Sequence, residues 1–176
     1  MESAPTIIYQ GNSAMKELPY RKQQRLKKYN YGEAGAYFIT ICTQNRIPFF
    51  GGVGADLISA RMIDRIFNET MKLYDNIYAY EYVIMPNHVH AIIILEYRTE
   101  NQQHTISEIV QTFKRHSTVE YINLVKQGIV QPFDKKLWQR SFHDHIIRNE
   151  KGYKTISDYI KNNPFMWEQD VFHVDT

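Results

Sequence analysis

The sequence contains a single cysteine, Cys42, among its 176 residues. One thiol cannot form an intramolecular disulfide, and the β-branched neighbours in YFITICT predict that Cys42 is a buried small side chain in a reducing compartment. Long apolar runs are also missing, because no stretch approaches the roughly 18 residues of a membrane-spanning helix. The N-terminus has neither a basic start nor a sustained apolar segment. We therefore expect a cytoplasmic protein without a membrane segment.

The chain lacks a large net charge as well. Its formal charge is +2, so overall charge neither requires nor excludes a nucleic-acid partner. The glycine-rich segment GGVG at 51–54 lacks the lysine and the serine or threonine of a phosphate-binding loop. A length of 176 residues with 43% hydrophobic residues fits one domain with an ordinary core.

Positive charge is concentrated near the N-terminus. The segment YRKQQRLKKYNYG has no acidic residue and no helical or strand period, so we expect residues 1–30 to form a basic arm and 31–176 to form one domain. Cations interleaved with tyrosines can follow a phosphate backbone and stack on bases. The alternative is a solvated basic tail. The predicted DNA-binding residues of the arm and of a later helix are Arg21, Lys22, Arg25, Lys27, Lys28, Lys114 and Arg115.

Hydrophobic periodicity predicts the first half of the domain. β-Branched and aromatic residues predict a strand over 37–43. Apolar residues at helical spacing predict a helix over 57–74, with the stripe Met62, Ile63, Ile66, Phe67, Met71 and Tyr74. Pro86 cannot donate to a sheet ladder, so the apolar stretch around it is expected to be two antiparallel strands, 78–85 and 88–95, joined by a tight turn at Pro86-Asn87.

The second half predicts two helices and one strand. A possible capping box of Thr105 and Glu108 opens a helix over 105–125, with the stripe Ile106, Ile109, Val110, Phe113, Val119 and Ile122. A fourth strand is expected over 137–148, and a last helix from 150 that is stopped by Pro164. This order predicts an α+β fold: a ferredoxin-like split β-α-β arrangement with a four-stranded antiparallel sheet, helices packed on one face and an added C-terminal helix.

The hairpin carries two histidines one residue apart. Alternate side chains of a strand share a face, so His88 and His90 point the same way and can present two nitrogens to one metal ion. The alternative is two polar side chains on an open sheet face. A second pair, His143 and His145, lies in the fourth strand. In the split β-α-β order this strand is separated from 88–95 by the first strand, about 10 Å away, so a structural or DNA-contacting role is favoured over metal ligation.

The last helix carries a candidate nucleophile. Tyr153, Ile156 and Ile160 form its apolar stripe, whereas Tyr159 stands at the edge of that stripe, one turn before Asn163. A tyrosine hydroxyl and a carboxamide oxygen are thus expected on the same side of the helix. For most of the 13 tyrosines the simpler role is packing, with a ring in the core and a hydroxyl at the surface.

Two motifs together resemble a known family. YVIMPNHVHAIIIL followed by WQRSFHDHIIRNEKGYKTISDYIKNNP resembles the HUH single-tyrosine transposases, and most closely the REP-associated tyrosine transposases of bacteria. RLKKYNYGEAGAYFITICTQNR resembles their N-terminus, so the similarity covers about residues 20 to 167. The resemblance implies His88 and His90 as metal ligands, Asn163 as the third ligand and Tyr159 as the nucleophile. It also implies a sheet and helix arrangement like the one predicted above.

The chemistry that the resemblance implies is strand transfer on single-stranded DNA. Tyr159 would attack a phosphodiester and stay linked to the 5′ phosphate, while a divalent ion, Mg²⁺ or Mn²⁺, stabilises the developing charge. From ligand type alone, zinc is also compatible. The implied partner is single-stranded or hairpin DNA, and the protein is expected as a monomer or a homodimer, with Tyr159 acting within its own subunit or across a dimer.

Two other classes use related features. A replication initiator or plasmid relaxase shares the histidine pair, but these proteins are expected to be longer, and relaxases carry the tyrosine near the start of the chain. A non-enzymatic single-strand binding module on the same fold needs aromatic platforms but neither metal nor nucleophile. Metal dependence of DNA cleavage separates this last alternative from a transposase.

Overall fold

The computed structural model describes residues 33–51, 55–97 and 104–173. The cations of the predicted basic arm, and the arm itself over 1–30, lie outside this part of the chain. The described residues form the order β1 (Gly35–Cys42), η1 (Gln44–Arg46), α1 (Ala55–Met71), β2 (Ile77–Met85), β3 (His88–Leu95), α2 (Ile106–Lys126), β4 (His143–Ile147), α3 (Glu150–Asn162) and η2 (Asn163–Gln169). None of the described helices is long and apolar enough to cross a membrane.

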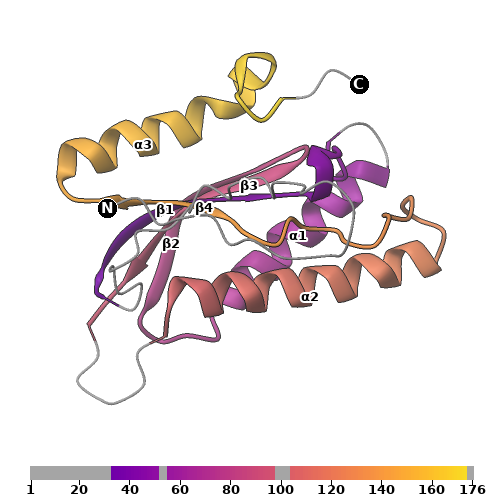
Figure 1. The fold of residues 1–176 in the computed structure, drawn as a ribbon, viewed down its shortest axis with the longest axis horizontal. Helices are drawn as coiled ribbons and strands as arrows, with labels where there is room; N and C mark the ends of the chain where they lie inside the picture. The colour runs from indigo at the N-terminus through magenta and orange to yellow at the C-terminus, as the bar shows by residue number, and fades with distance from the viewer. Residues whose placement is uncertain (1–32, 52–54, 98–103, 174–176) are drawn as a thin grey trace, which may run out of the picture.

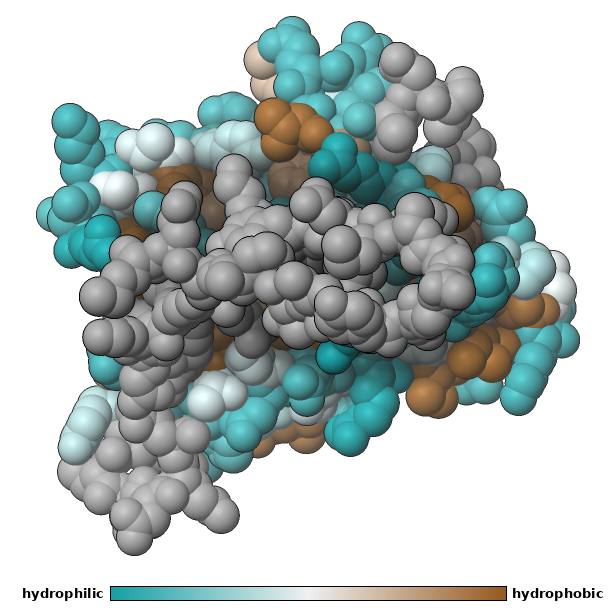
Figure 2. Space-filling model, viewed as in Figure 1, coloured by the Kyte–Doolittle hydropathy of each residue, from teal (hydrophilic) through white to brown (hydrophobic). Residues whose placement is uncertain are grey.

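The four strands form one antiparallel sheet in the order β2-β3-β1-β4. Helices α1 and α2 lie on one face of this sheet, and α3 lies across the other (Figure 1). The predicted α+β fold with its split β-α-β order and added C-terminal helix is confirmed. On the side of the molecule seen in Figure 2, hydrophilic residues cover most of the described surface, and the hydrophobic ones form separate patches.

The main core lies between the sheet and the pair α1 and α2. Alternate residues of β1 and β3, such as Ile39 and Ala91, are fully buried against the helices, and α2 adds Phe113 at the centre. The opposite face holds a smaller cluster of Ile92, Ile147 and Ile160, which anchors α3 on the sheet. The two-residue period therefore sends odd positions of β1 and β3 into the main core and leaves even positions facing α3.

The hairpin of β2 and β3 turns at Pro86 and Asn87, as predicted. The backbone N–H groups of Phe50 and Thr43 donate to the carbonyls of Pro86 and Asn87, both at 2.8 Å. A Cβ atom on Gly51 would overlap the Cα, Cβ and Cγ atoms of Pro86. The turn is therefore packed tightly against the segment that follows η1.

The ends of α1 and α2 follow the sequence prediction with two differences. Helix α1 ends at Met71, so Tyr74 lies beyond it, although its ring still packs against the main core. Helix α2 begins at Ile106, and Thr105 is its N-cap and forms the predicted capping box with Glu108. Its second half, however, buries Ser117 and Tyr121, whereas Val119 and Ile122 are exposed. The predicted stripe is wrong there because Tyr121 packs against an aromatic cluster of Phe49, Phe50 and Phe133.

The fourth strand and the last helix differ from their predicted bounds. The strand expected over 137–148 is regular only from His143, because Leu137, Trp138 and Phe142 all enter the same core and break the alternation. Trp138 instead forms an isolated bridge with Thr43. The helix α3 ends before Pro164, but the chain continues as the 3-10 helix η2, in whose first turn a proline is tolerated.

Candidate active site

His88 and His90 lie next to each other on the face of β3 that α3 covers. Their side chains are 0% and 1% exposed, and their ring centroids are 4.3 Å apart. The intervening residue Val89 is in the main core on the other side of the sheet. The predicted common face of the two histidines is therefore present, and it is a buried face.

Neighbouring polar groups orient both imidazole rings. His88 Nδ1 lies 2.8 Å from Asn87 Oδ1, an oxygen that only accepts, so Nδ1 donates and Nε2 keeps its lone pair. His90 Nδ1 lies 2.8 Å from the hydroxyl of Thr40, which supports either tautomer because it donates or accepts. Asn87 is held in place because its Nδ2 donates to the carbonyls of Arg46 and Phe172.

Burial keeps both histidines neutral. Loss of water, together with the neighbouring His90, lowers the pKa of His88 to about 3. Burial also lowers the pKa of His90, although the nearby Asp170 opposes this shift. His88 Nε2 is fully buried and has no hydrogen-bond partner among the described residues. A neutral imidazole with an unpaired buried nitrogen has the state that a metal ligand requires.

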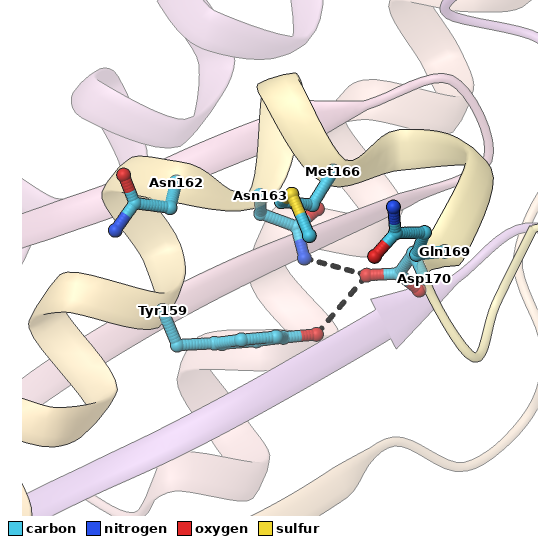
Figure 3. A pocket seen from close by; sticks show the side chains of 6 residues that line it. All are labelled: Tyr159, Asn162, Asn163, Met166, Gln169 and Asp170. Atoms are coloured by element: carbon cyan, nitrogen blue, oxygen red, sulfur yellow. Dashed lines mark hydrogen bonds between the residues drawn. The ribbon is translucent and has the colours of Figure 1, made fainter.

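Asn163 is buried at the point where α3 passes into η2. Its Nδ2 donates to Asp170 Oδ2 at 2.5 Å, whereas its Oδ1 is buried without a hydrogen-bond partner in the described part of the chain. Asn163 and Tyr159 are one helical turn apart, and both side chains point toward Asp170 (Figure 3). The side chains predicted to share one side of the helix thus meet at one carboxylate.

Asp170 is a site residue that the sequence reasoning missed. Its Oδ2 lies 3.9 Å from His90 Nε2, and its Oδ1 accepts from the backbone N–H of Phe172 at 2.6 Å. Ligand atoms of His88, His90 and Asp170 all lie within 4.8 Å of one another. Burial alone would raise the pKa of Asp170, but His90, the Asn163 amide and the Phe172 N–H stabilise the carboxylate and hold the pKa far below its usual range.

The side chain of Tyr159 extends from α3 toward the histidines and reaches the Asp170 carboxylate. The residue is 40% exposed, and its hydroxyl lies 3.2 Å from His90 Nε2 and donates to Asp170 Oδ2 at 3.0 Å. Burial and the Asp170 carboxylate raise the pKa of the hydroxyl to about 12. The other candidate, Tyr153, packs instead beside the small cluster around Ile160, as the apolar stripe predicts.

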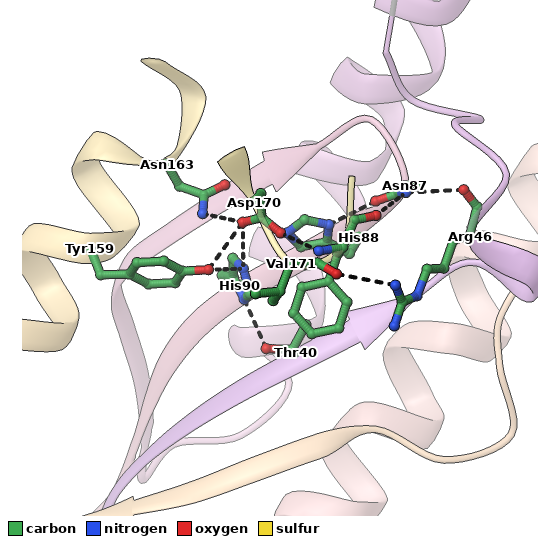
Figure 4. Close-up of polar contacts among 10 residues, drawn as sticks. Thr40, Arg46, Asn87, His88, His90, Tyr159, Asn163, Asp170 and Val171 are labelled. Carbon is green, nitrogen blue, oxygen red and sulfur yellow. Dashed lines mark hydrogen bonds and ion pairs between the residues drawn. The ribbon is translucent and has the colours of Figure 1, made fainter. Parts of the chain in front are cut away.

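The segment after η2 covers the histidines. The ring of Phe172 has its centroid 5.0 Å from that of His88 and 5.7 Å from that of His90. Arg46 Nη1 donates to the carbonyl of Val171 at 3.1 Å and stacks over Phe172. Figure 4 shows these contacts converging around His88, His90 and Asp170.

This donor set fits a divalent cation. Two imidazoles and one carboxylate place ligand atoms within 4.8 Å of one another, and the Asn163 carboxamide lies beside them through its Nδ2 bond to Asp170. Among the described residues, His88 Nε2 and Asn163 Oδ1 are buried ligand-type atoms without a hydrogen-bond partner. Mixed nitrogen and oxygen donors suit Mn²⁺ and Zn²⁺, and Mg²⁺ accepts the oxygens most readily. Tyr159 stands beside this donor set with a hydroxyl that can act as a nucleophile.

The remaining predicted site residues lie elsewhere. Lys114 and Arg115 are on α2, on the opposite face of the sheet from Tyr159. Lys114 Nζ donates to the carbonyls of Gln139 and Ser141, which belong to the irregular segment before β4. DNA contact by these two cations and by the arm stays a prediction.

Comparison with known proteins adds independent information. The family described as "Transposase IS200 like" matches residues 32–163. A Haemophilus influenzae protein described as uncharacterized is 34% identical over 174 residues, covering 89% of this chain and 94% of that protein. A protein of the same organism assigned as a REP-associated tyrosine transposase is 27% identical over 159 residues, covering 83% and 84% of the two chains.

Two solved structures share the fold. One is a REP-associated tyrosine transposase bound to a REP hairpin, with a TM-score of 0.59, 22% identity and coverage of 81% of this chain and 74% of that chain. The other is a Deinococcus radiodurans protein described as a transposase, with a TM-score of 0.50, 18% identity and coverage of 78% and 95%. At these identities the likeness concerns the fold.

Proposed function

Because the chain belongs to the IS200-like transposase family, we propose that it is a metal-dependent enzyme that cleaves and rejoins single-stranded DNA through a covalent 5′-phosphotyrosine. The observation that carries this proposal is the position of Tyr159. Its hydroxyl touches both His90 Nε2 and Asp170 Oδ2, at the edge of a cluster of ligand atoms. A nucleophile beside a bound cation meets the phosphate that the cation binds.

His88, His90 and Asn163 hold the divalent ion in this proposal, and Asp170 joins them as a carboxylate ligand. Mn²⁺ or Mg²⁺ is the expected ion, since both exchange water for phosphate oxygens. When bound, the ion polarises the phosphoryl group under attack. Asn87 and Thr40 orient the two imidazoles so that their Nε2 atoms face the cation site.

Tyr159 supplies the nucleophilic oxygen. Its pKa of about 12 keeps the hydroxyl protonated at rest, so the proton must leave as the new bond forms. The Asp170 carboxylate accepts a hydrogen bond from this hydroxyl and so orients the nucleophilic oxygen. Its low pKa makes Asp170 a weak base, so the proton passes to solvent, which reaches the 40% exposed Tyr159. The tyrosine oxygen then forms a bond to phosphorus, the bond to the 3′ oxygen breaks, and the released 3′ oxygen takes up a proton. Reversal of the same step rejoins DNA without a nucleotide cofactor.

The proposed substrate is a single-stranded segment that flanks a DNA hairpin. The structural neighbour bound to a REP hairpin supports this choice at the level of the fold. We propose that Arg21, Lys22, Arg25, Lys27, Lys28, Lys114 and Arg115 add affinity for phosphates. Deletion of 1–28 is then expected to weaken DNA binding and to reduce the slope of log Kd against log salt concentration. An unchanged slope in fluorescence anisotropy titrations would remove the arm from DNA binding.

The test of the function is trapping of the covalent adduct. Wild-type protein incubated with Mn²⁺ or Mg²⁺ and labelled single-stranded hairpin DNA is expected to give an adduct that survives denaturing electrophoresis. Tyr159→Phe deletes one oxygen, keeps the ring and should abolish the adduct. Tyr153→Phe is the matched control on the same helix and should retain it. Peptide mapping should place the phosphotyrosine at Tyr159.

The outcomes separate the alternatives. An adduct that persists in Tyr159→Phe, or that maps to Tyr153, overturns the assignment of the nucleophile. DNA binding without any adduct in either metal favours the non-enzymatic single-strand binding module. Thermal unfolding of each variant checks that loss of the adduct does not reflect loss of the fold.

A further inference from the structure

Figure 3 shows a cavity lined by Tyr159, Asn163 and Asp170, and a second cavity shares Tyr159 with it. The second cavity has a volume of about 300 Å³, at the lower end of the range for small-ligand sites. It is bounded by β1, by β4, by Tyr159 and His90, and by the segment Val171 and Phe172. The proposed nucleophile and one proposed metal ligand thus form one wall, and β4 forms the opposite wall.

The β4 wall carries His143 and His145. In the sheet register Thr40 pairs with His143 and Phe38 with His145, so both histidines share the face of Phe38, Thr40 and His90. The intervening Asp144 pairs with Ile39, whose side chain lies in the main core. β4 is an edge strand of the sheet, so this side of the cavity is open to an incoming chain.

His143 and His145 have no structural task within the described residues. Both are exposed, and neither imidazole has a hydrogen-bond partner there. Within 33–51, 55–97 and 104–173, the one ring contact of the pair is that of His143 with Phe172, whose centroids are 5.7 Å apart. By contrast, His88 and His90 are fixed by Asn87 and Thr40. Two imidazoles that the described part of the chain leaves without a hydrogen-bond partner, at the wall of a cavity that reaches Tyr159, can bind a ligand.

The chemistry of the cavity fits a nucleobase better than a bare phosphate. Phe38 provides an aromatic ring that already packs at a tilt on His90 and edge-on to Tyr159. Each imidazole ring carries two nitrogens that form hydrogen bonds, which suits the polar edge of a base. Unstacked bases are bound in proteins by aromatic stacking combined with hydrogen bonds to their edges.

We propose that this cavity binds the base of one unstacked nucleotide next to the scissile phosphate, with Phe38 as the apolar wall and His143 and His145 as hydrogen-bonding partners of the base edge. This inference rests on the proposed function and names a subsite of the same active site. The two histidines act as specificity residues, because they select the nucleotide beside the bond that Tyr159 attacks.

The experiment uses oligonucleotides in which one nucleotide at a time of the single-stranded flank is abasic. For wild type, one position beside the cleavage site should show a loss of about tenfold in kcat/KM for adduct formation. The double variant His143→Ala, His145→Ala should lose about tenfold on intact DNA, mainly through KM. It should show no further loss when that same position is abasic. Losses at other positions should remain as in wild type.

His116→Ala is the control, because His116 lies on α2 beneath the opposite face of the sheet. This variant should keep the wild-type profile at every position. If the double variant retains the full abasic loss at every position, or if kcat falls and KM does not change, the subsite is overturned. Because His143 and His145 are exposed, their substitution should leave thermal unfolding unchanged.

The same oligonucleotides keep the two proposals apart. If wild-type protein forms no adduct with any of them, the proposed function fails, and the subsite is then tested by anisotropy binding in the same series. A binding loss at one abasic position that disappears in the double variant supports a base subsite without catalysis. Equal binding of wild type and double variant across the series overturns it.

Discussion

The two faces of the sheet differ in what they bury. The face under α1 and α2 holds the large core, and its buried hydroxyls donate to backbone carbonyls, as Ser117 does to Phe113 and Thr70 to Ile66. The face under α3 buries only Ile92, Ile147 and Ile160 as a cluster. Beside them it buries His88 and Asn163, each with one polar atom that is unpaired among the described residues; Asn76 Oδ1 and Asp144 Oδ1 are unpaired in the same sense elsewhere.

Most of the apolar core thus lies on one face, and the proposed metal ligands and nucleophile lie on the other. Burying an unpaired polar atom costs roughly 1–3 kcal/mol, so the α3 face carries a cost that the main core must offset. The cost disappears when a ligand pairs the atoms. If the two faces are separable, a substitution on one face leaves the properties of the other unchanged.

The largest expected effect on stability belongs to the α1 and α2 face. Phe113 is 0% exposed and packs against Phe67 and Trp138. Phe113→Ala should lower the free energy of unfolding by about 3–5 kcal/mol, measured by urea denaturation. The Mn²⁺ affinity of the folded fraction should not change. A tenfold change in that affinity would show that the two faces are coupled.

His88→Ala should instead reduce DNA cleavage and metal binding strongly and the free energy of unfolding only slightly. Loss of one proposed ligand should reduce DNA cleavage about a thousandfold, equivalent to about 4 kcal/mol, and Mn²⁺ binding should disappear in calorimetry. In chelator the free energy of unfolding should fall by no more than about 2 kcal/mol, because among the described residues the imidazole loses only its Nδ1 bond to Asn87, and Nε2 has no partner there. Full cleavage by this variant in chelator would remove the metal from the mechanism.

A smaller effect is expected at Asn87, which orients His88. Asn87→Ala removes the acceptor of the His88 Nδ1 hydrogen bond and should weaken Mn²⁺ binding about 10–100-fold. Asn87→Asp keeps an oxygen at that place and should retain most of the affinity. Equal losses in both variants would instead assign the effect to the Nδ2 contacts with Arg46 and Phe172.

The smallest expected effect is at the N-terminus of α2. Thr105 accepts from the backbone N–H of Glu108, whose side chain accepts from the Thr105 N–H. Thr105→Ala should lower the free energy of unfolding by about 1 kcal/mol. Metal binding and cleavage should stay at the wild-type level. A clear loss of cleavage in the stable variant would contradict the separation of the faces.

The fold was predictable where an element buries one regular face. The hairpin, α1 and the start of α2 have periods of 2 or 3.6 that report directly on the core. The pattern failed over 137–142, where Leu137, Trp138 and Phe142 enter one core from an irregular segment. It also failed at Tyr121, whose partners Phe49 and Phe133 are distant in sequence. Packing of this kind leaves no local period.

Regular periods also made the candidate site residues up to Asn163 predictable, whereas Asp170 was not predictable. Strand alternation places His88 and His90 together, and the helical turn relates Tyr159 to Asn163. Asp170 follows a 3-10 segment that has no hydrophobic period, and its role depends on the chain turning back over the sheet. The sequence signal was only an acidic residue seven positions after Asn163. The predicted helix end at Pro164 gave no reason to place Asp170 near the site.

The close packing of Gly51 on Pro86 makes position 51 intolerant of substitution. Any side chain at 51 must displace the turn that leads into Asn87 and His88, since a Cβ atom there would overlap Pro86 itself. In a saturation library, position 51 should therefore accept almost no replacement, although it lies outside the catalytic set. Substitutions at Gly51 should abolish DNA cleavage as substitutions at His88 do, although the two residues are 37 positions apart in the sequence.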